Sequence, residues 1–266
     1  MSNNKIKLQV LFLTYGDKYK ESFDILNIYL KELEEYCDIN IMTIHNDYMS
    51  GGFNFYPDGG VIGDNTAYEF SGWSQGMLYL AEDKTDYDVC LFINDSFLVN
   101  DYYRNKKLLS IETIRGCLSE NALVGGVDRL DWNLDFRNHK YEINGKDVKA
   151  WIRTNLFYMT KEMIDSLDSM VSITKGDLNK FISQEYHGRA FLHNADISIN
   201  LQLQMIAYFT KHWHSKRDIN AENWETWRFK VHAMCMEKLL YVKVKELGFN
   251  IYDYSEFHYE GCENAK

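Results

Sequence analysis

The sequence predicts an α/β fold in which helices flank a mostly parallel central sheet and the C-terminal part is helical. Two observations carry this prediction. Residues 6–44 read as a strand, a helix and a second strand, and strands joined through a helical crossover are parallel to each other. The last third of the chain then changes to apolar positions at three- and four-residue steps, which are typical of helices.

The first unit justifies the parallel sheet. Ile6 to Leu13 alternates at first and then becomes continuously apolar, the pattern of a strand buried on both faces. From Lys18 to Tyr36 the apolar residues fall near helical spacing, and Ile39 to Ile44 is a second strand-like run. Stacked right-handed crossovers of this kind form a doubly wound sheet.

The middle of the chain continues the alternation of helices and strands. The buried run Val89 to Ile93 is its clearest strand, and it follows a glycine-rich connection, Gly51 to Gly63, and a helix. Thr160 is expected to cap the helix that begins after it. The other expected elements are helices at 68–81 and 111–118, strands at 122–127 and 148–159, and a polar segment at 128–147.

The C-terminal third is expected to be helical at 195–210 and at 222–247, with Gly248 as the stop signal of the second helix. Trp224 and Trp227 lie at helical spacing, which favours packing in the core or on a dimer face. No repeat or Pro/Ser-rich linker divides the chain, so we expect one domain over residues 1–266. Within it, residues 1–210 would form the α/β core and 211–266 a helical extension.

Composition and charge exclude several classes of protein. A chain of 266 residues with 45% hydrophobic and 26% charged residues is an ordinary globular protein. The net charge of −10 opposes nucleic-acid binding, which depends on clustered Lys and Arg. No apolar run approaches the ~20 residues of a membrane helix, which predicts a cytoplasmic protein. The five cysteines are widely spaced and odd in number, so neither a disulfide framework nor a zinc knuckle is expected.

Polar residues that directly follow the strands are the candidate site, because open α/β sheets bind ligands beyond the carboxyl ends of their strands. The first strand is followed by Thr14, Tyr15 and Asp17, the second by His45, Asn46 and Asp47, and the third by Asn94, Asp95 and Ser96. We expect the three groups to converge on one edge of the sheet. Asp95 in particular would hold a divalent cation, Mn²⁺ or Mg²⁺, that bridges a diphosphate. The alternative is that Asp95 merely stabilises a turn.

Two stretches resemble a known family. They are GDNTAYEFSGWSQGML, Gly63 to Leu78, and YDVCLFINDSF, Tyr87 to Phe97. They are similar to bacterial polysaccharide glycosyltransferases of the GT-A fold, most of all to the rhamnan-synthesis type, in which N-D-S or N-D-T follows the central strand. The resemblance implies a GT-A-like, Rossmann-like sheet and a D-x-D position that binds metal and nucleotide sugar. Here Asn94 and Ser96 stand where that motif has acids.

The resemblance also implies roles for individual residues. Asp47 and Tyr15 would hold the nucleoside, with Asn65 on the nucleotide-sugar side of the cleft. Thr14 is a further expected contact of the nucleotide sugar. WIRTNLFYM, Trp151 to Met159, resembles the strand on the acceptor side, which points to Thr154 and Asn155. HNADISINL, His193 to Leu201, resembles the segment in which a carboxylate at a helix start is the catalytic base, here Asp196. Helix capping is the alternative role for Asp196.

A basic segment, Lys211 to Arg217, interrupts the acidic chain. By the same resemblance it would cover a nucleotide diphosphate, with His214 as a second metal ligand; a solvated loop is the alternative. Motifs of other enzymes are absent, among them G-x-S-x-G, GK[ST] and G-x-G-x-x-G, which favours a nucleotide sugar over NAD or ATP by elimination.

The expected function is transfer of a sugar from a nucleotide-diphosphate donor to a glycan or other hydroxylated acceptor, in the synthesis of a cell-surface polysaccharide. Two alternatives stay open. The first is a catalytically degenerate protein that binds nucleotide sugars or carbohydrates, which Asn94 and Ser96 favour. The second is a structural partner that uses the Trp-rich C-terminal helix. Peripheral membrane association and a homodimer are further partner hypotheses.

Overall fold

The computed structural model describes residues 5–16, 19–46, 60–99, 102–130, 139–212 and 217–258. In these residues a seven-stranded sheet has the order β3-β2-β1-β4-β8-β5-β9. Neighbouring strands are parallel except for β8, which is antiparallel to both β4 and β5. The strands of the sheet are β1 (Ile6–Thr14), β2 (Cys37–His45), β3 (Val61–Ile62), β4 (Val89–Asn94), β5 (Ala122–Arg129), β8 (Ala150–Thr160) and β9 (Asn250–Asp253), while β6 (Glu142–Ile143) and β7 (Lys146–Asp147) form a separate hairpin.

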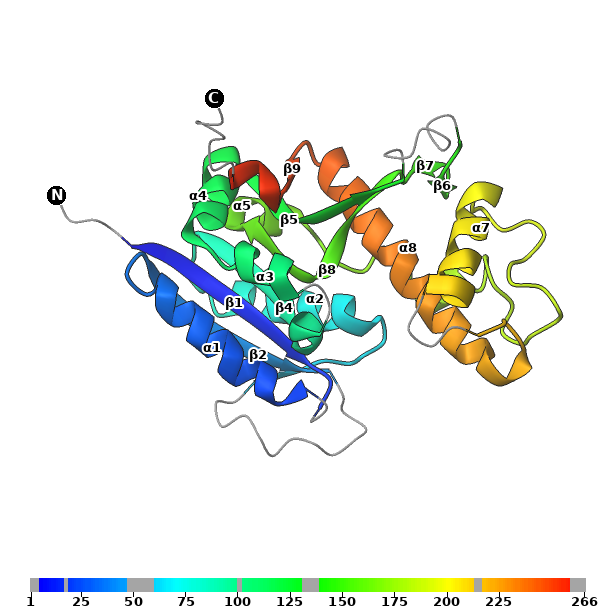
Figure 1. Cartoon of the computed structure of the whole chain (residues 1–266), viewed down its shortest axis with the longest axis horizontal. Helices are drawn as coiled ribbons and strands as arrows, with labels where there is room; N and C mark the ends of the chain where they lie inside the picture. Colours follow the sequence, from blue (N-terminus) through cyan, green and yellow to red (C-terminus); the bar gives the residue numbers. More distant parts are fainter. Residues whose placement is uncertain are drawn as a thin grey trace, which may run out of the picture.

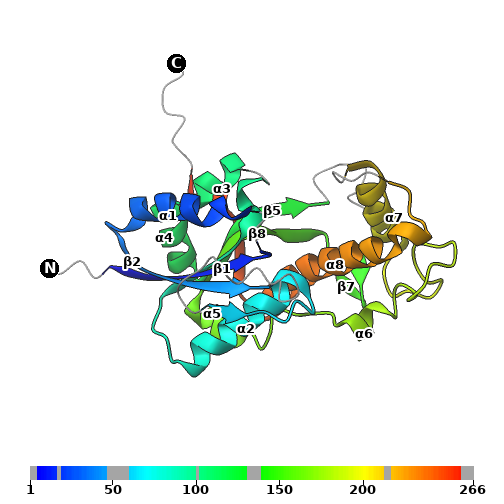
Figure 2. The same ribbon diagram turned by 90° about the horizontal axis from the view of Figure 1, so that it is seen from below.

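Helices cover both faces of this sheet, as Figures 1 and 2 show. Their bounds are α1 (Glu21–Leu33), α2 (Tyr68–Glu82), η3 (Asp95–Leu98), α3 (Tyr102–Leu108), α4 (Ile111–Glu120), α5 (Lys161–Ser166), α6 (Lys175–Leu178), α7 (Ile199–Ala207), η5 (Tyr208–His212), η6 (Ala221–Asn223), α8 (Trp224–Glu246) and η7 (Tyr254–Phe257). α1 and α4 share one hydrophobic core with Val10 and Phe12 of β1. α2 and α8 share the other core with Leu11 and Leu13. Because alternate side chains of β1 enter opposite cores, this strand is apolar along most of its length. The predicted mostly parallel sheet flanked by helices is confirmed.

The order of the strands reverses between β1 and β4. The chain passes from β1 through α1 to β2 on one face, and from β3 through α2 to β4 on the other face (Figure 2). The carboxyl ends of β1 and β4 therefore lie side by side, with Leu13 paired to Asn94. In open α/β sheets this switch point is where the ligand crevice forms.

Several helix boundaries follow the signals in the sequence. The Thr160 side chain accepts a hydrogen bond from the Met163 N–H at the start of α5, which confirms the predicted cap. α8 ends at Glu246, and Gly248 follows with a φ of 87°, the left-handed conformation that favours glycine at a helix stop. Trp224 and Trp227 are buried, so their predicted packing in the core is confirmed.

The C-terminal part is not only helical. α8 spans 23 residues and packs against β8, but the chain then returns to the sheet, where β9 pairs with β5 as an edge strand. The helix expected at 195–210 begins four residues later, at Ile199, with Ser198 as the residue that precedes it. The reason is a β-bridge between Ile143 and Ile197, which holds the preceding segment extended.

Candidate functional site

The candidate site begins where β1 and β4 end. The backbone N–H of Tyr15 donates to Asp95 Oδ2 over 2.8 Å, and the Thr14 hydroxyl donates to the same oxygen over 3.2 Å. Asp95 is only 1% exposed. Its backbone carbonyl also accepts a hydrogen bond from Ser22 at the start of α1, over 2.5 Å. The predicted convergence of Thr14, Tyr15 and Asp95 on one edge is confirmed, and Asp95 ties β1, α1 and β4 together there.

Asn94 and Ser96 bond mainly to each other. Asn94 Oδ1 accepts the Ser96 backbone N–H at 3.2 Å and the Ser96 hydroxyl at 2.7 Å, which caps the short helix η3. The capping role weighed for the aspartate therefore belongs to the asparagine before it. Among the described residues, no group of three or more His, Cys, Asp or Glu is placed to hold a metal ion. Asp17, Asp47 and His214 lie outside the described residues.

A pair of glutamates meets at one threonine on the α2 and α8 side of this edge. Thr154 Oγ1 lies 3.1 Å from Glu69 Oε1 and 3.2 Å from Glu237 Oε1, both hydrogen-bond distances. Glu69 stands in the first turn of α2, Thr154 on β8 and Glu237 in the middle of α8. The Tyr15 hydroxyl donates to Glu69 Oε2 over 3.2 Å. One chain of contacts therefore runs from Asp95 through Tyr15, Glu69 and Thr154 to Glu237.

The electrostatics of this chain follow from its burial. Removal from water raises the pKa of the Glu69 carboxyl above its usual range and is the largest cause. A backbone hydrogen bond lowers this pKa, the Glu237 carboxylate raises it, and the hydrogen bond from Thr154 and the charge of Lys230 lower it by smaller amounts. Burial also raises the pKa of the Tyr15 phenol far above its usual value, with Glu69 as the second cause. Tyr15 is therefore neutral at physiological pH and can donate its proton in a hydrogen bond.

Asn46 closes the site on the β2 side. Its backbone N–H donates to Thr14 O over 2.9 Å, and its Nδ2 donates to Asn65 Oδ1 over 3.1 Å and to Tyr68 O over 2.7 Å. The side chain is fully buried. Its Oδ1 sits so close to Gly63 that a Cβ there would approach to 2.2 Å. This close approach explains the glycine that opens the 63–78 stretch.

Two cationic side chains, Arg153 and Lys238, interact electrostatically with Glu237. Arg153 forms a two-pronged contact with Asp128, with Nε to Oδ2 at 2.6 Å and a second bond at 3.1 Å. Lys238 is 2% exposed, and its ammonium lies 3.8 Å from the centre of the Trp151 ring. Burial lowers the pKa of Lys238, and Glu237 is the charge that opposes this most strongly.

Thr154 and Asn155, the two residues expected on the acceptor side, have different hydrogen-bond partners. Thr154 joins the glutamate pair. Asn155 instead donates through Nδ2 to Asn105 Oδ1 over 3.0 Å, and Asn105 in turn donates to Phe97 O over 2.5 Å. Asn155 therefore links β8 to α3 and η3, away from the glutamates.

Asp196, the predicted base, lies in a different part of the molecule. It is exposed, and its backbone carbonyl accepts the Asn144 N–H over 2.8 Å. It precedes Ser198 by two residues and does not head α7. In Figures 1 and 2, α7 and β7 lie on the side of the molecule opposite α1. Its hydrogen bond with Asn144 lies outside the chain of contacts from Asp95 to Glu237.

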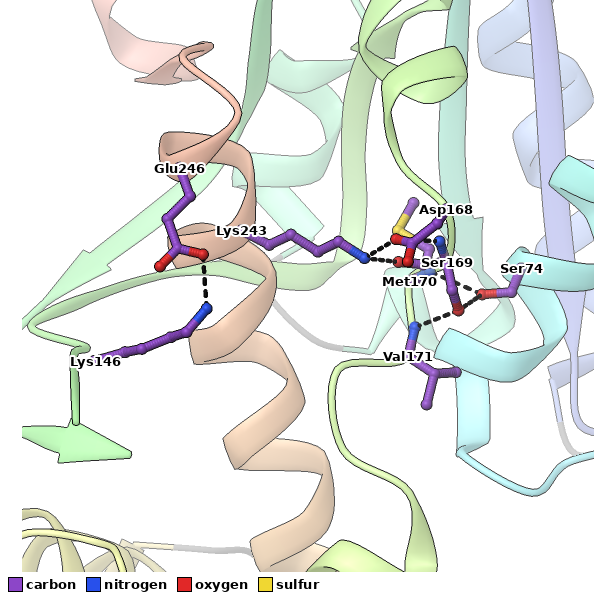
Figure 3. Close-up of polar contacts among 8 residues, drawn as sticks. All are labelled: Ser74, Lys146, Asp168, Ser169, Met170, Val171, Lys243 and Glu246. Atoms are coloured by element: carbon purple, nitrogen blue, oxygen red, sulfur yellow. Dashed lines mark hydrogen bonds and ion pairs between the residues drawn. The ribbon is translucent and has the colours of Figure 1, made fainter. Parts of the chain in front are cut away.

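A brace fixes the helices that carry the two glutamates, as Figure 3 shows. Lys243 of α8 contacts Asp168 and donates to Ser169 O over 2.8 Å. Ser74 of α2 lies 3.2 Å from the Ser169 hydroxyl and accepts the Met170 N–H over 2.9 Å. α2 and α8 therefore both bond to the same short segment.

A cavity of about 410 Å³ lies elsewhere, between α2 and α5, with Tyr87, Lys84 and Lys161 among its lining residues. Tyr87 precedes β4, so this cavity is at the end of the sheet opposite to Asp95. It does not include any of the predicted site residues.

Sequence reasoning missed Glu69, Glu237 and Lys238. Glu69 falls inside the 63–78 stretch singled out above, where an acid in the first turn of a helix was a usable signal. Glu237 and Lys238 carry a weaker signal, adjacent charges in a helix that is otherwise apolar on several sides.

No protein-family model, curated protein or solved structure matches the chain. Within the described part of the chain, none of the helices combines the length and apolar character needed to cross a membrane.

Proposed function

We propose that the protein is a glycosyltransferase that moves a sugar from a nucleotide-diphosphate donor to a hydroxyl group of a glycan or similar acceptor. The observation that carries the proposal is the polar edge at the switch point between β1 and β4. There Asp95, Tyr15 and Thr14 meet, with Glu69, Thr154 and Glu237 beside them. An open α/β sheet binds nucleotide ligands at this position. The proposal includes a central sheet of the GT-A type.

Each residue of the edge has a proposed role. The backbone at Thr14 and Tyr15, held by Asp95, would form the wall that receives the nucleoside, with Asn65 on the other side of Asn46. Ser96 and Asn94 would face the diphosphate. Three roles stay predictions: Asp47 as a contact of the nucleoside, His214 as a metal ligand and Asp196 as the catalytic base.

A divalent cation remains part of the proposal. Asp95 is the one predicted ligand among the described residues, and its Oδ2 already accepts two hydrogen bonds. A cation would therefore need ligands from the donor diphosphate and from further residues of the chain. It would neutralise charge on the leaving nucleoside diphosphate.

A second candidate is a protein that binds nucleotide sugars without catalysis. The mutual hydrogen bonds of Asn94 and Ser96 favour it, because these side chains satisfy each other and are not acids. Both candidates bind nucleotide sugars, but only the glycosyltransferase releases nucleoside diphosphate from them.

Incubation with UDP-, GDP- and dTDP-sugars, with Mn²⁺ and separately with EDTA, tests the proposal. A glycosyltransferase is expected to release nucleoside diphosphate, faster with an acceptor glycan. Stabilisation against heating by nucleoside diphosphates without release supports the binding protein, because a ligand of the folded state raises its melting temperature. If the protein neither releases nucleoside diphosphate nor is stabilised by it, both candidates are contradicted.

A further inference from the structure

The cavity between α2 and α5 is separate from the edge of the sheet at which Asp95 lies. Its volume is about 410 Å³, within the range of roughly 300–1,000 Å³ that small-molecule sites occupy. Tyr87 lines it just before β4 begins, and Asp95 follows β4, so the length of this strand separates the cavity from the switch point. Ser74 and Asp168 belong both to its lining and to the brace in Figure 3. The cavity therefore adjoins the segment that bonds to α2 and α8.

The buried part of the cavity wall is apolar. It is formed by side chains that are no more than 7% exposed, namely Met77, Leu80, Tyr87, Ile164 and Leu167. The Lys161 ammonium lies 5.4 Å from the centre of the Tyr87 ring, and burial raises the pKa of the Tyr87 phenol above its usual value, so this phenol is neutral. Such a wall favours an aliphatic chain or a ring, because contact with it removes apolar surface from water.

The exposed rim of the cavity carries an excess of positive charge. Its two carboxylates each have a lysine partner, since Lys161 Nζ lies 2.6 Å from Asp165 Oδ2 and Lys243 contacts Asp168. Lys84 is a further cation of the rim, two residues after the end of α2. Because both carboxylates are paired with lysines, the charge of Lys84 makes the rim complementary to an anionic group.

The backbone conformation of Lys84 is a second observation. Its φ is 53°, in the left-handed region where glycine is the usual residue after a helix. The Lys84 N–H donates to Ala81 O over 3.3 Å and the Thr85 N–H donates to Leu80 O over 3.0 Å, which closes the end of α2. A glycine would form this turn at a lower conformational cost. A strained residue whose side chain the turn does not need is typical of a position kept for a ligand.

We propose that this cavity binds a small amphipathic acid, a molecule with an aliphatic or aromatic body and one ionised carboxylate. The body lies against Met77, Leu80 and Tyr87, and the carboxylate pairs with the Lys84 ammonium. A neutral or cationic molecule of the same shape gains the apolar contact but not the ion pair, so the site discriminates by charge. The site is independent of the proposed glycosyltransferase function, because none of the residues at the switch point lines it.

Octanoate, octanol and octylammonium test the ligand class, because they share one aliphatic chain and differ in charge. NMR of protein labelled with ¹³C at the methionine methyl groups follows the Met77 signal, which is assigned by its loss in Met77→Leu. Octanoate is expected to shift this signal saturably and to leave the signal of Met205, which does not line the cavity, unchanged. Octanol and octylammonium should bind more weakly. An unshifted Met77 signal, or equal affinity for the three probes, overturns the proposal.

Substitutions test the residues that hold the ligand. Lys84→Gln is expected to weaken octanoate binding by about two- to fivefold, which is the contribution of an exposed ion pair, and to leave octanol binding unchanged. Lys31→Gln is the matched control, since Lys31 is an exposed lysine in the last turn of α1, and it should bind both probes as the wild type does. Ala81→Phe fills the cavity and should abolish the shift of Met77 by octanoate. Undiminished octanoate affinity in Lys84→Gln overturns the ion pair, and a retained shift in folded Ala81→Phe overturns the location.

Discussion

The backbone N–H of Tyr15 donates to the carboxylate of Asp95, and this bond joins the ends of two strands that are 80 residues apart in sequence. A similar bond joins the same two strands at their other end, where Lys7 N–H donates to Asp88 over 2.8 Å. The buried bond closes the switch point, whereas the other lies at the exposed opposite end. Asp95 and Asp88 can therefore be compared as a buried and an exposed acceptor of a backbone hydrogen bond between the same two strands.

Asp95→Ala is expected to lower the free energy of unfolding by about 1.5–3 kcal/mol, because it leaves buried donors of Thr14 and Tyr15 without a charged acceptor. It should also weaken nucleoside diphosphate binding. Asp88→Ala should cost less and leave binding unchanged. Urea unfolding and a nucleotide titration of both variants check this. Equal effects of the two variants on binding would remove Asp95 from the site.

The raised pKa of Glu69 predicts a dependence of stability on pH. The folded state keeps the Glu69 proton at pH values where the unfolded state has lost it, so the favourable contribution is complete below the ordinary Glu pKa. It is lost as pH rises through the folded-state pKa. Glu69→Gln should therefore gain stability relative to wild type as pH rises. Urea unfolding across this range measures it, and parallel curves for the two proteins would contradict the raised pKa.

Lys238→Met is expected to raise the free energy of unfolding at neutral pH by about 1 kcal/mol, because it removes a charge from a side chain that is only 2% exposed. The lowered pKa of Lys238 means that the unfolded state binds more protons at alkaline pH, so wild-type stability should rise with pH there. The variant should lack this rise. Destabilisation by Met would show that contact with Trp151 outweighs the burial of charge.

Asp196→Asn is expected to change the free energy of unfolding by less than about 0.5 kcal/mol, because the side chain is exposed and the fold uses its backbone carbonyl. This variant also tests the predicted role of Asp196 as the catalytic base. A loss of turnover with intact donor binding would support that role, and unchanged turnover would remove Asp196 from it.

Gly63→Ala is expected to destabilise the protein by about 1–3 kcal/mol, because the new methyl group would press against Asn46 Oδ1. Gly176→Ala is the control, since a Cβ there meets only Thr174 Oγ1 at an ordinary 3.5 Å. Thermal unfolding of the two variants measures the difference. An unaffected Gly63→Ala protein would mean that the Asn46 side chain has room to move.

Much of the fold was predictable because β1 and β4 contain runs of apolar residues. The strands predicted at Ile6 to Leu13 and Val89 to Ile93 correspond to β1 and β4, and the edge where they end followed from their parallel direction. The edge strand β9 was not found, since four partly exposed residues carry no such pattern. The antiparallel direction of β8 was also beyond the sequence, because a strand buried on both sides reads the same in either direction.

The site was predictable in part for the same reason. Asp95 directly follows β4, so it lies at the edge of the sheet where the parallel strands β1 and β4 end. Glu69 and Glu237 come from two helices that are far apart in sequence and meet at Thr154 of β8, and no local spacing encodes such a meeting. Asp196 shows the converse, because a helical period suggested a helix start that the bridge at Ile197 moves to a later residue.

The segment from Asp168 to Val171 has a consequence for how distant substitutions act. It grips α2 at Ser74 and α8 at Lys243, five and six residues away from Glu69 and Glu237 along the respective helices. Loosening that grip would let the two helices slide by fractions of an ångström and open the gap at Thr154. A mutational survey limited to residues near Glu69 and Glu237 would overlook this segment.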